Sequence, residues 1–240
     1  MDKVTRITAG IFIIIFVIVA GTGLYNAYVN MQYRNSLAST YAYTLTISTS
    51  EKLSNVTFFI PVPVDPAGDS PFVRQWSSRA VPGVPAGWET VLLGSGKGTM
   101  LKIKTPVIGG SDGGSYSVRI SSDERVDRLI DTKSPQENDI LFRPVQNMAG
   151  ADCAGFENQK AGATCYRYLS AIYADYDSSP NARVEIGSTI AGRNEWKIFK
   201  PESNEYSNSI TALMLGDNHG WVVAKGEVQA GSGSYDAPKI

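Results

Sequence analysis

The first residues that suggest chemistry are a lysine between glycines in LLGSGKGTM, residues 92–100. A phosphate-binding P-loop has a glycine five residues before its Gly-Lys pair and a Ser or Thr directly after the lysine. Here Val91 takes the first of these positions, and Gly98 follows Lys97. The residues after Gly98 alternate like a strand, whereas a P-loop leads into a helix. We therefore predict a glycine hairpin with Lys97 at its tip and no nucleotide binding.

His219 is the only histidine in the chain, so a Ser-His-Asp hydrolase would have to use it. It lies in GDNHGW, residues 216–221, among residue types that favour turns. We predict an exposed turn histidine without a catalytic role.

Three acidic residues, Asp123, Glu124 and Asp127, alternate with Arg125 and Arg128. Such a mixture is typical of a solvated surface whose charges neutralise one another. The paired carboxylates of a glycosidase leave no local sequence pattern, so an extracytoplasmic hydrolase of glycan or peptide stays an alternative function.

Cys153 and Cys165 are the only cysteines, and their short separation predicts one local disulfide in an oxidising compartment. Closing a loop of this size stabilises a fold by about 3 kcal/mol in the chain-entropy model. A zinc site would need further ligands, and the chain has one histidine. We therefore assign no metal ligands and expect no cofactor, while a structural calcium ion held by Asp112, or by Asp175 and Asp177, stays an alternative.

Two tryptophans, Trp76 and Trp88, lie in a segment rich in proline and glycine, residues 65–88. We expect this segment to be a long irregular loop and its tryptophans to be candidate ligand contacts, because exposed aromatic rings bind sugars or protein partners. Asn55 begins an Asn-Val-Thr pattern for N-glycosylation.

An uncharged apolar run from Ile7 to Tyr25 is long enough to span a bilayer as a helix of about 28 Å. Lys3 and Arg6 precede the run, and the next basic residue is Arg34. The positive-inside rule therefore predicts a single-pass anchor with residues 1–6 in the cytoplasm and the remainder outside the cell.

Two alternatives compete with this anchor. A secretory signal peptide would be cleaved after the small residues Val19-Ala20-Gly21. A pilin-like leader would be cut at Gly10, so that the mature chain begins at Ile11 and its helix packs into a filament.

The rest of the chain predicts a mainly β fold: a stalk over residues 26–40, a β-sandwich-like ectodomain over 41–230 and a flexible tail over 231–240. Alternating apolar residues indicate strands at residues 41–49, 55–64, 115–121 and 140–145. Glycine-rich turns predict hairpins centred on residues 94–98, 191–194 and 216–220. The segment 164–176 fits either a short helix or a strand.

The 22 basic and 23 acidic residues nearly cancel, which disfavours nucleic acid as a partner. The basic leader, single apolar helix, Tyr- and Thr-rich β region and one glycosylation pattern resemble the layout of uncharacterised single-pass surface proteins of archaea. The resemblance implies a cell-envelope location. We predict a membrane-anchored binding, adhesion or envelope-structural module without catalytic activity, whose partner is an envelope protein or a glycan.

Overall fold

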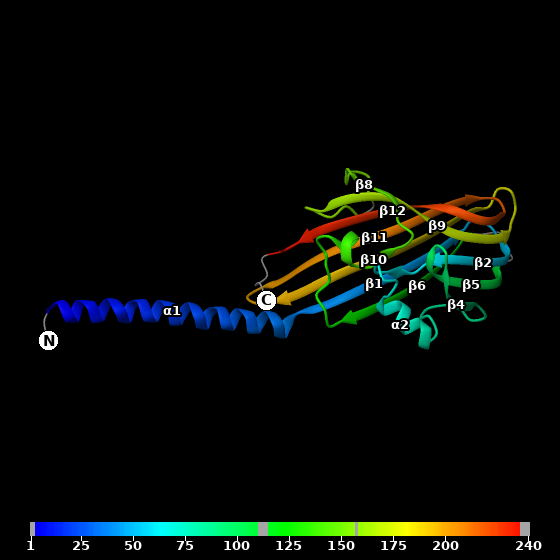
Figure 1. The fold of residues 1–240 in the computed structure, drawn as a ribbon. Coiled ribbons are helices and arrows are strands. Elements are labelled where there is room, and N and C mark those ends of the chain that lie inside the picture. The colour runs from blue at the N-terminus through cyan, green and yellow to red at the C-terminus, as the bar shows by residue number, and fades with distance from the viewer. Residues whose placement is uncertain (1–2, 110–114, 157, 236–240) are drawn as a thin grey trace.

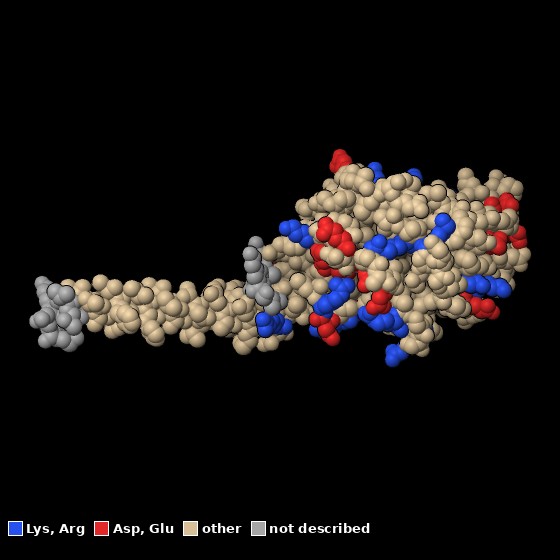
Figure 2. Space-filling view, in the orientation of Figure 1, with Lys and Arg blue, Asp and Glu red and all other residues tan. Residues whose placement is uncertain are grey.

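A long helix, α1 (Lys3–Ser36), projects from a β-rich domain in the computed structural model, which describes residues 3–109, 115–156 and 158–235 (Figure 1). Its Ile7–Ser36 part is long and apolar enough to cross a membrane, and none of its most apolar stretch is buried against the domain. Charged side chains gather on the domain, while the helix is almost free of them on the face that Figure 2 shows. The apolar helix is therefore an anchor or a signal segment.

The helix runs into the first strand, β1 (Ala38–Thr49), with only Leu37 between them, so residues 26–36 of the predicted stalk are helical and residues 38–40 belong to β1. The last turn of α1 is held by the domain: Tyr33 packs edge-on against Trp196, with ring centroids 5.7 Å apart. The Ser36 hydroxyl also bonds both backbone groups of Lys197. These contacts join the end of α1 to the end of β10.

Ten strands form one antiparallel sheet that curls into a half-barrel, in the order β4-β5-β2-β9-β12-β11-β10-β1-β6, with β8 beside β9. The predicted mainly β class is confirmed, but the expected pair of sandwiched sheets is one curled sheet. An alternating pattern reports only that one face of a strand is buried, and a curled sheet satisfies it as well as a sandwich does. The remaining strands of this sheet are β2 (Leu53–Pro61), β4 (Glu89–Ser95), β5 (Gly98–Ile108), β6 (Tyr116–Val126), β8 (Gln146–Ala151), β9 (Thr164–Asp177), β10 (Arg183–Lys197), β11 (Pro201–Leu215) and β12 (Asn218–Gly233).

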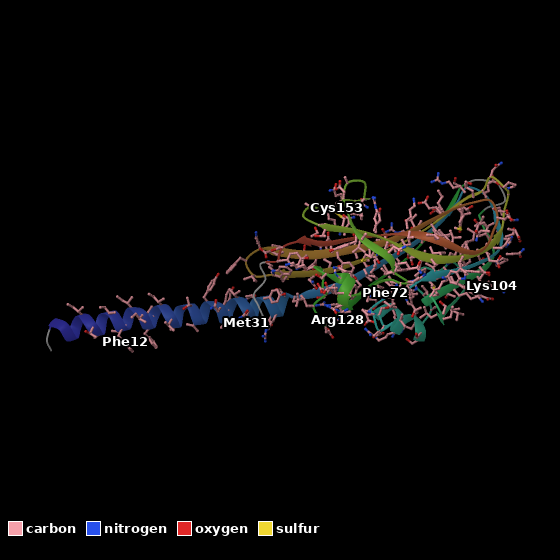
Figure 3. All side chains as sticks on the ribbon, turned by 45° about the horizontal axis from the view of Figure 1, so that its top comes forward. Phe12, Met31, Phe72, Lys104, Arg128 and Cys153 are labelled. Carbon is pink, nitrogen blue, oxygen red and sulfur yellow. A yellow bond between two sulfur atoms is a disulfide. The ribbon has the colours of Figure 1, made fainter. Side chains whose placement is uncertain are left out.

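Short elements cover the inner face of the sheet: α2 (Pro71–Ser78), α3 (Pro135–Asn138) and a two-stranded sheet of β3 (Pro63–Val64) and β7 (Leu141–Phe142). Ser70 caps the N-terminus of α2, because its hydroxyl accepts a hydrogen bond from the Val73 amide, and the helix brings Phe72 to the core (Figure 3). The segment predicted as an irregular loop over 65–88 therefore contains a helix that closes the core.

Two of the three predicted hairpins are confirmed, those between β4 and β5 and between β11 and β12. The turn predicted at residues 191–194 is wrong, because β10 continues through it to Lys197. Gly192 lies opposite Tyr206 of β11, and its missing side chain makes room for that ring. The ambiguous segment 164–176 is strand β9, and β12 extends to Gly233. Residues 236–240 of the predicted tail lie outside the described residues.

Candidate functional site

Four large apolar side chains share the outer face of the sheet at the end away from α1: Leu213 (52% exposed), Leu215 (72%), Trp221 (45%) and Val223 (64%). We call these four residues the distal patch. Their neighbours Ala212, Met214 and Ala224 point into the core, so the patch faces solvent because of the alternation along β11 and β12. An apolar surface of this kind marks an interaction site more often than isolated exposed residues do.

The hydrogen-bond ladder between β11 and β12 ends at the Thr211–Lys225 pair, just before the patch. Continuing that register places Leu213 opposite Val223 and Leu215 opposite Trp221. Beyond this point β11 still pairs with β10, while β12 still pairs with β9. The four apolar side chains therefore lie where the two strands separate.

Trp221 is fixed by a row of aromatic rings that crosses three strands. Its ring packs edge-on against Tyr173 of β9, with centroids 5.5 Å apart, and Tyr173 stacks on Phe59 of β2 at 4.8 Å. Both contacts join residues directly opposite each other in the register. Such cross-strand pairs stabilise a sheet and restrict the rings to one arrangement.

Two lysines cover the ends of this row. The ammonium of Lys97 lies 5.1 Å from the centre of the Trp221 ring, and that of Lys102 lies 6.0 Å from the centre of the Phe59 ring. Lys97 lies at the tip of the β4–β5 hairpin, as predicted, because Ser95 and Gly98 pair on either side of it. Its role in the structure is a cation–π contact with Trp221.

His219 lies beside the patch among three carboxylates. Its Nδ1 is 2.7 Å from Asp175, and its Nε2 is 3.7 Å from Asp217 and 3.9 Å from Asp177. The hydrogen bond to Asp175 raises the pKa of His219 above its ordinary value, and the charges of all three carboxylates add to the effect. Within the described residues, no group of three or more His, Cys, Asp and Glu side chains is arranged to hold a metal ion.

The carboxylate of Asp177 also accepts a 2.6 Å hydrogen bond from the side-chain nitrogen of Asn55, the predicted glycosylation residue. Asn55 is exposed and has a positive φ of 55°, which places it at an irregularity in β2. A glycan on this nitrogen would lie next to the three carboxylates that surround His219.

A second polar site lies at the α1 end of the domain, where an open groove of about 750 Å³ runs between α2 and the end of β6. Its lining includes the predicted acids Glu124 and Asp127, together with four arginines, Arg74, Arg79, Arg125 and Arg128. This arrangement is the mixed charged surface that the sequence predicts, in which Arg74 pairs with Asp69 and Arg128 pairs with Asp139.

Under this groove, Asp139 is fully buried and accepts hydrogen bonds from four donors. They are the Tyr41 hydroxyl, the Arg128 guanidinium at 3.1 Å, and the amides of Asp131 at 2.9 Å and Ile140 at 2.8 Å. Burial raises the pKa of Tyr41, and the neighbouring Asp139 carboxylate raises it further. The network ties β1 to the segment that covers the inner face.

The structure corrects one of the predicted ligand contacts. Trp76 is only 6% exposed and packs against Tyr43 at 5.1 Å, because it lies on the core-facing side of α2. Trp88 is half-buried against the same core. The predicted disulfide between Cys153 and Cys165 is present.

Sequence reasoning missed the distal patch, although the chain carries a signal for it. Most outward positions of these strands are polar, but residues 212–215 (ALML) and 221–224 (WVVA) are apolar at consecutive positions. A strand with both faces apolar is covered on both faces or binds something.

Comparisons with known proteins give no relative: no protein-family model, curated protein or solved structure matches the chain. The resemblance to archaeal surface proteins therefore remains a prediction.

Proposed function

We propose that this chain is a single-pass membrane protein, with its N-terminus in the cytoplasm, that holds a protein partner outside the cell on its distal patch. The exposed apolar helix and the disulfide support export with membrane attachment. The observation that carries the binding function is the cluster of Leu213, Leu215, Trp221 and Val223 in solvent.

A protein surface suits this patch better than a sugar does. Sugars stack on free ring faces, but Tyr173 and Phe59 cover each other's faces, and Lys97 lies over Trp221. The other three patch residues are aliphatic, and they form with Trp221 an apolar centre of the kind found in protein interfaces. Lys97 and the His219 cluster supply the charged rim that usually surrounds such a centre.

Site-specific photo-crosslinking of the full chain in its host membrane tests this proposal. A photoreactive amino acid at Val223 is compared with the same residue at Thr189, which is exposed on the outer face of β10 outside the patch. We expect a discrete protein adduct from position 223 and none from 189, and the adduct is lost when Leu215→Ser is added. Equal labelling at the two positions, or no adduct at 223, would refute the binding site.

The continuous α1 helix favours a second candidate, a subunit of a pilin-like filament, because the exposed helix from Ile11 to Ser36 that cleavage would leave is long enough to pack into a filament core. This candidate requires cleavage at Gly10, so the mature N-terminus separates it from the anchor.

A further inference from the structure

The tip of the β10–β11 hairpin, residues 198–200, carries a phenylalanine where a hairpin normally has polar residues. Phe199 is 66% exposed, and Lys197 and Lys200 flank it. Its ring stacks on Tyr25 of α1, with centroids 6.4 Å apart and ring planes 15° apart. The hairpin tip thus lies beside the helix at the level of Tyr25.

The level of Tyr25 along α1 is set by the apolar run. From Ile7 to Tyr25 the helix rises about 28 Å, close to the roughly 30 Å thickness of the hydrocarbon core of a bilayer. Tyr25 therefore falls at the outer boundary of the membrane, where aromatic side chains concentrate. Phe199 must share that level because its ring contacts the Tyr25 ring.

The tip cannot easily move away from this level, because the hairpin and the helix are joined firmly. Tyr33 and Trp196 pack together and are 2% and 3% exposed. The Ser36 hydroxyl accepts from the Lys197 amide at 2.9 Å and lies 3.0 Å from the Lys197 carbonyl, to which it donates. The direction of α1 relative to the sheet is therefore fixed at the point where the hairpin begins.

We infer that the β10–β11 tip is a second membrane contact: Phe199 inserts into the outer interface of the same phospholipid bilayer that α1 crosses. Lys197 and Lys200 stand on either side to meet lipid phosphates, since long basic side chains reach the headgroup layer from such positions. The inference rests on the proposed anchoring by α1. It places the base of the domain directly on the membrane.

Depth-dependent fluorescence quenching of the full chain tests this contact in vesicles of phosphatidylcholine and phosphatidylglycerol. Both native cysteines are in the disulfide, so a single new cysteine carries the environment-sensitive dye. The variants are Phe199→Cys and Lys200→Cys at the tip, Val17→Cys within α1 and Thr189→Cys on the outer face of β10. Circular dichroism melting verifies that each labelled variant keeps the wild-type fold. If Phe199→Cys does not keep it, Lys200→Cys reports the depth of the hairpin tip.

We expect the dye at the tip about 15 Å from the bilayer centre and the dye at Thr189 beyond the headgroups, more than about 20 Å from it. The dye at Val17 should be quenched most by spin labels deep in the acyl chains. If Val17 is quenched but the tip dye is as water-exposed as that at Thr189, the contact is refuted while the anchor stands. A tip dye that is shielded from water but unquenched by lipid labels also refutes it, because a protein then covers the tip. If Val17 is unquenched, the anchor and the contact both fail.

Discussion

At the residue scale, His219 is the most informative titrating group beside the distal patch. Its hydrogen bond to Asp175 favours the charged imidazolium, so its pKa lies above the ordinary value of about 6.5. The folded protein therefore binds this proton more tightly than the unfolded chain does. The resulting stabilisation is complete below pH about 6.5 and is lost as pH rises through the raised pKa.

The first prediction is that Asp175→Asn moves the pKa of His219 back toward its ordinary value, because the charged hydrogen-bond partner is removed. Asp217→Asn should lower it less, because Asp217 is 3.7 Å away and its charge makes the smallest contribution. The imidazole resonances of the only histidine, followed by NMR against pH, measure both shifts. Equal shifts in the two variants would show that the Asp175 hydrogen bond is not the main cause.

The second prediction concerns Asp139, which is buried among four hydrogen-bond donors. Asp139→Asn removes the charge that these donors share and puts an amide NH₂ among them, so we expect a loss of about 3 kcal/mol in the free energy of unfolding. Chemical denaturation measures this loss. Asp123→Asn, at an exposed position on β6, is the control and should change stability by less than about 0.5 kcal/mol. A similar effect of the two substitutions would contradict the buried network.

At the element scale, two glycines are needed because each lies opposite a tyrosine on the next strand. A Cβ at Gly192 would lie 2.2 Å from the Tyr206 ring, and one at Gly226 would lie 2.4 Å from the Tyr168 ring. Neither ring can move freely: the Tyr206 hydroxyl donates to the Ile140 carbonyl, and Tyr168 exchanges hydrogen bonds with Asn208.

The third prediction is that Gly192→Ala destabilises the domain by about 1–3 kcal/mol, because it overpacks a buried site. Gly187→Ala on the same strand is the matched control, since a Cβ there meets nothing within 4 Å. That change should be neutral or slightly stabilising. Thermal unfolding measures the Tm of both variants. Equal Tm values would contradict the prediction and would mean that the Tyr206 ring moves to make room for the methyl group.

The same glycines show what sequence could and could not predict. Hairpins with glycine at a true turn, such as the one carrying Lys97, are recognisable because their flanking strands alternate. Gly192 has the same local signature, yet its role depends on Tyr206, fourteen residues further along the chain and visible only once the register is known. Burial of Trp76 likewise depends on which face α2 turns to the sheet. The distal patch requires knowing that no element of the described chain covers that face.

At the scale of the whole molecule, α1 contains both of the predicted cleavage sites, so the residue at which the mature chain begins decides between an anchor, a signal peptide and a filament helix. The fourth prediction is that protein recovered from the host membrane fraction is uncleaved and still carries residues 1–6 before the apolar run that begins at Ile7. Intact-mass measurement and N-terminal sequencing provide the check. A start at Ile11 would identify a filament subunit, and a start near Thr22 would identify a secreted protein.

The attachment of α1 to β1 has a mechanical consequence. Strand β1 pairs with β10 along its entire length from Ala38 to Thr49, and with β6 from Ser39 to Thr49. A partner pulling on the distal patch while the anchor stays in the membrane loads these strands along their length, so the two ladders flanking β1 must shear together. Hydrogen bonds loaded in parallel share the tension, whereas an edge strand pulled sideways would unzip one pair at a time. With the proposed anchor and the proposed partner in place, this arrangement would let the domain resist stretching between the membrane and the protein bound at the distal patch.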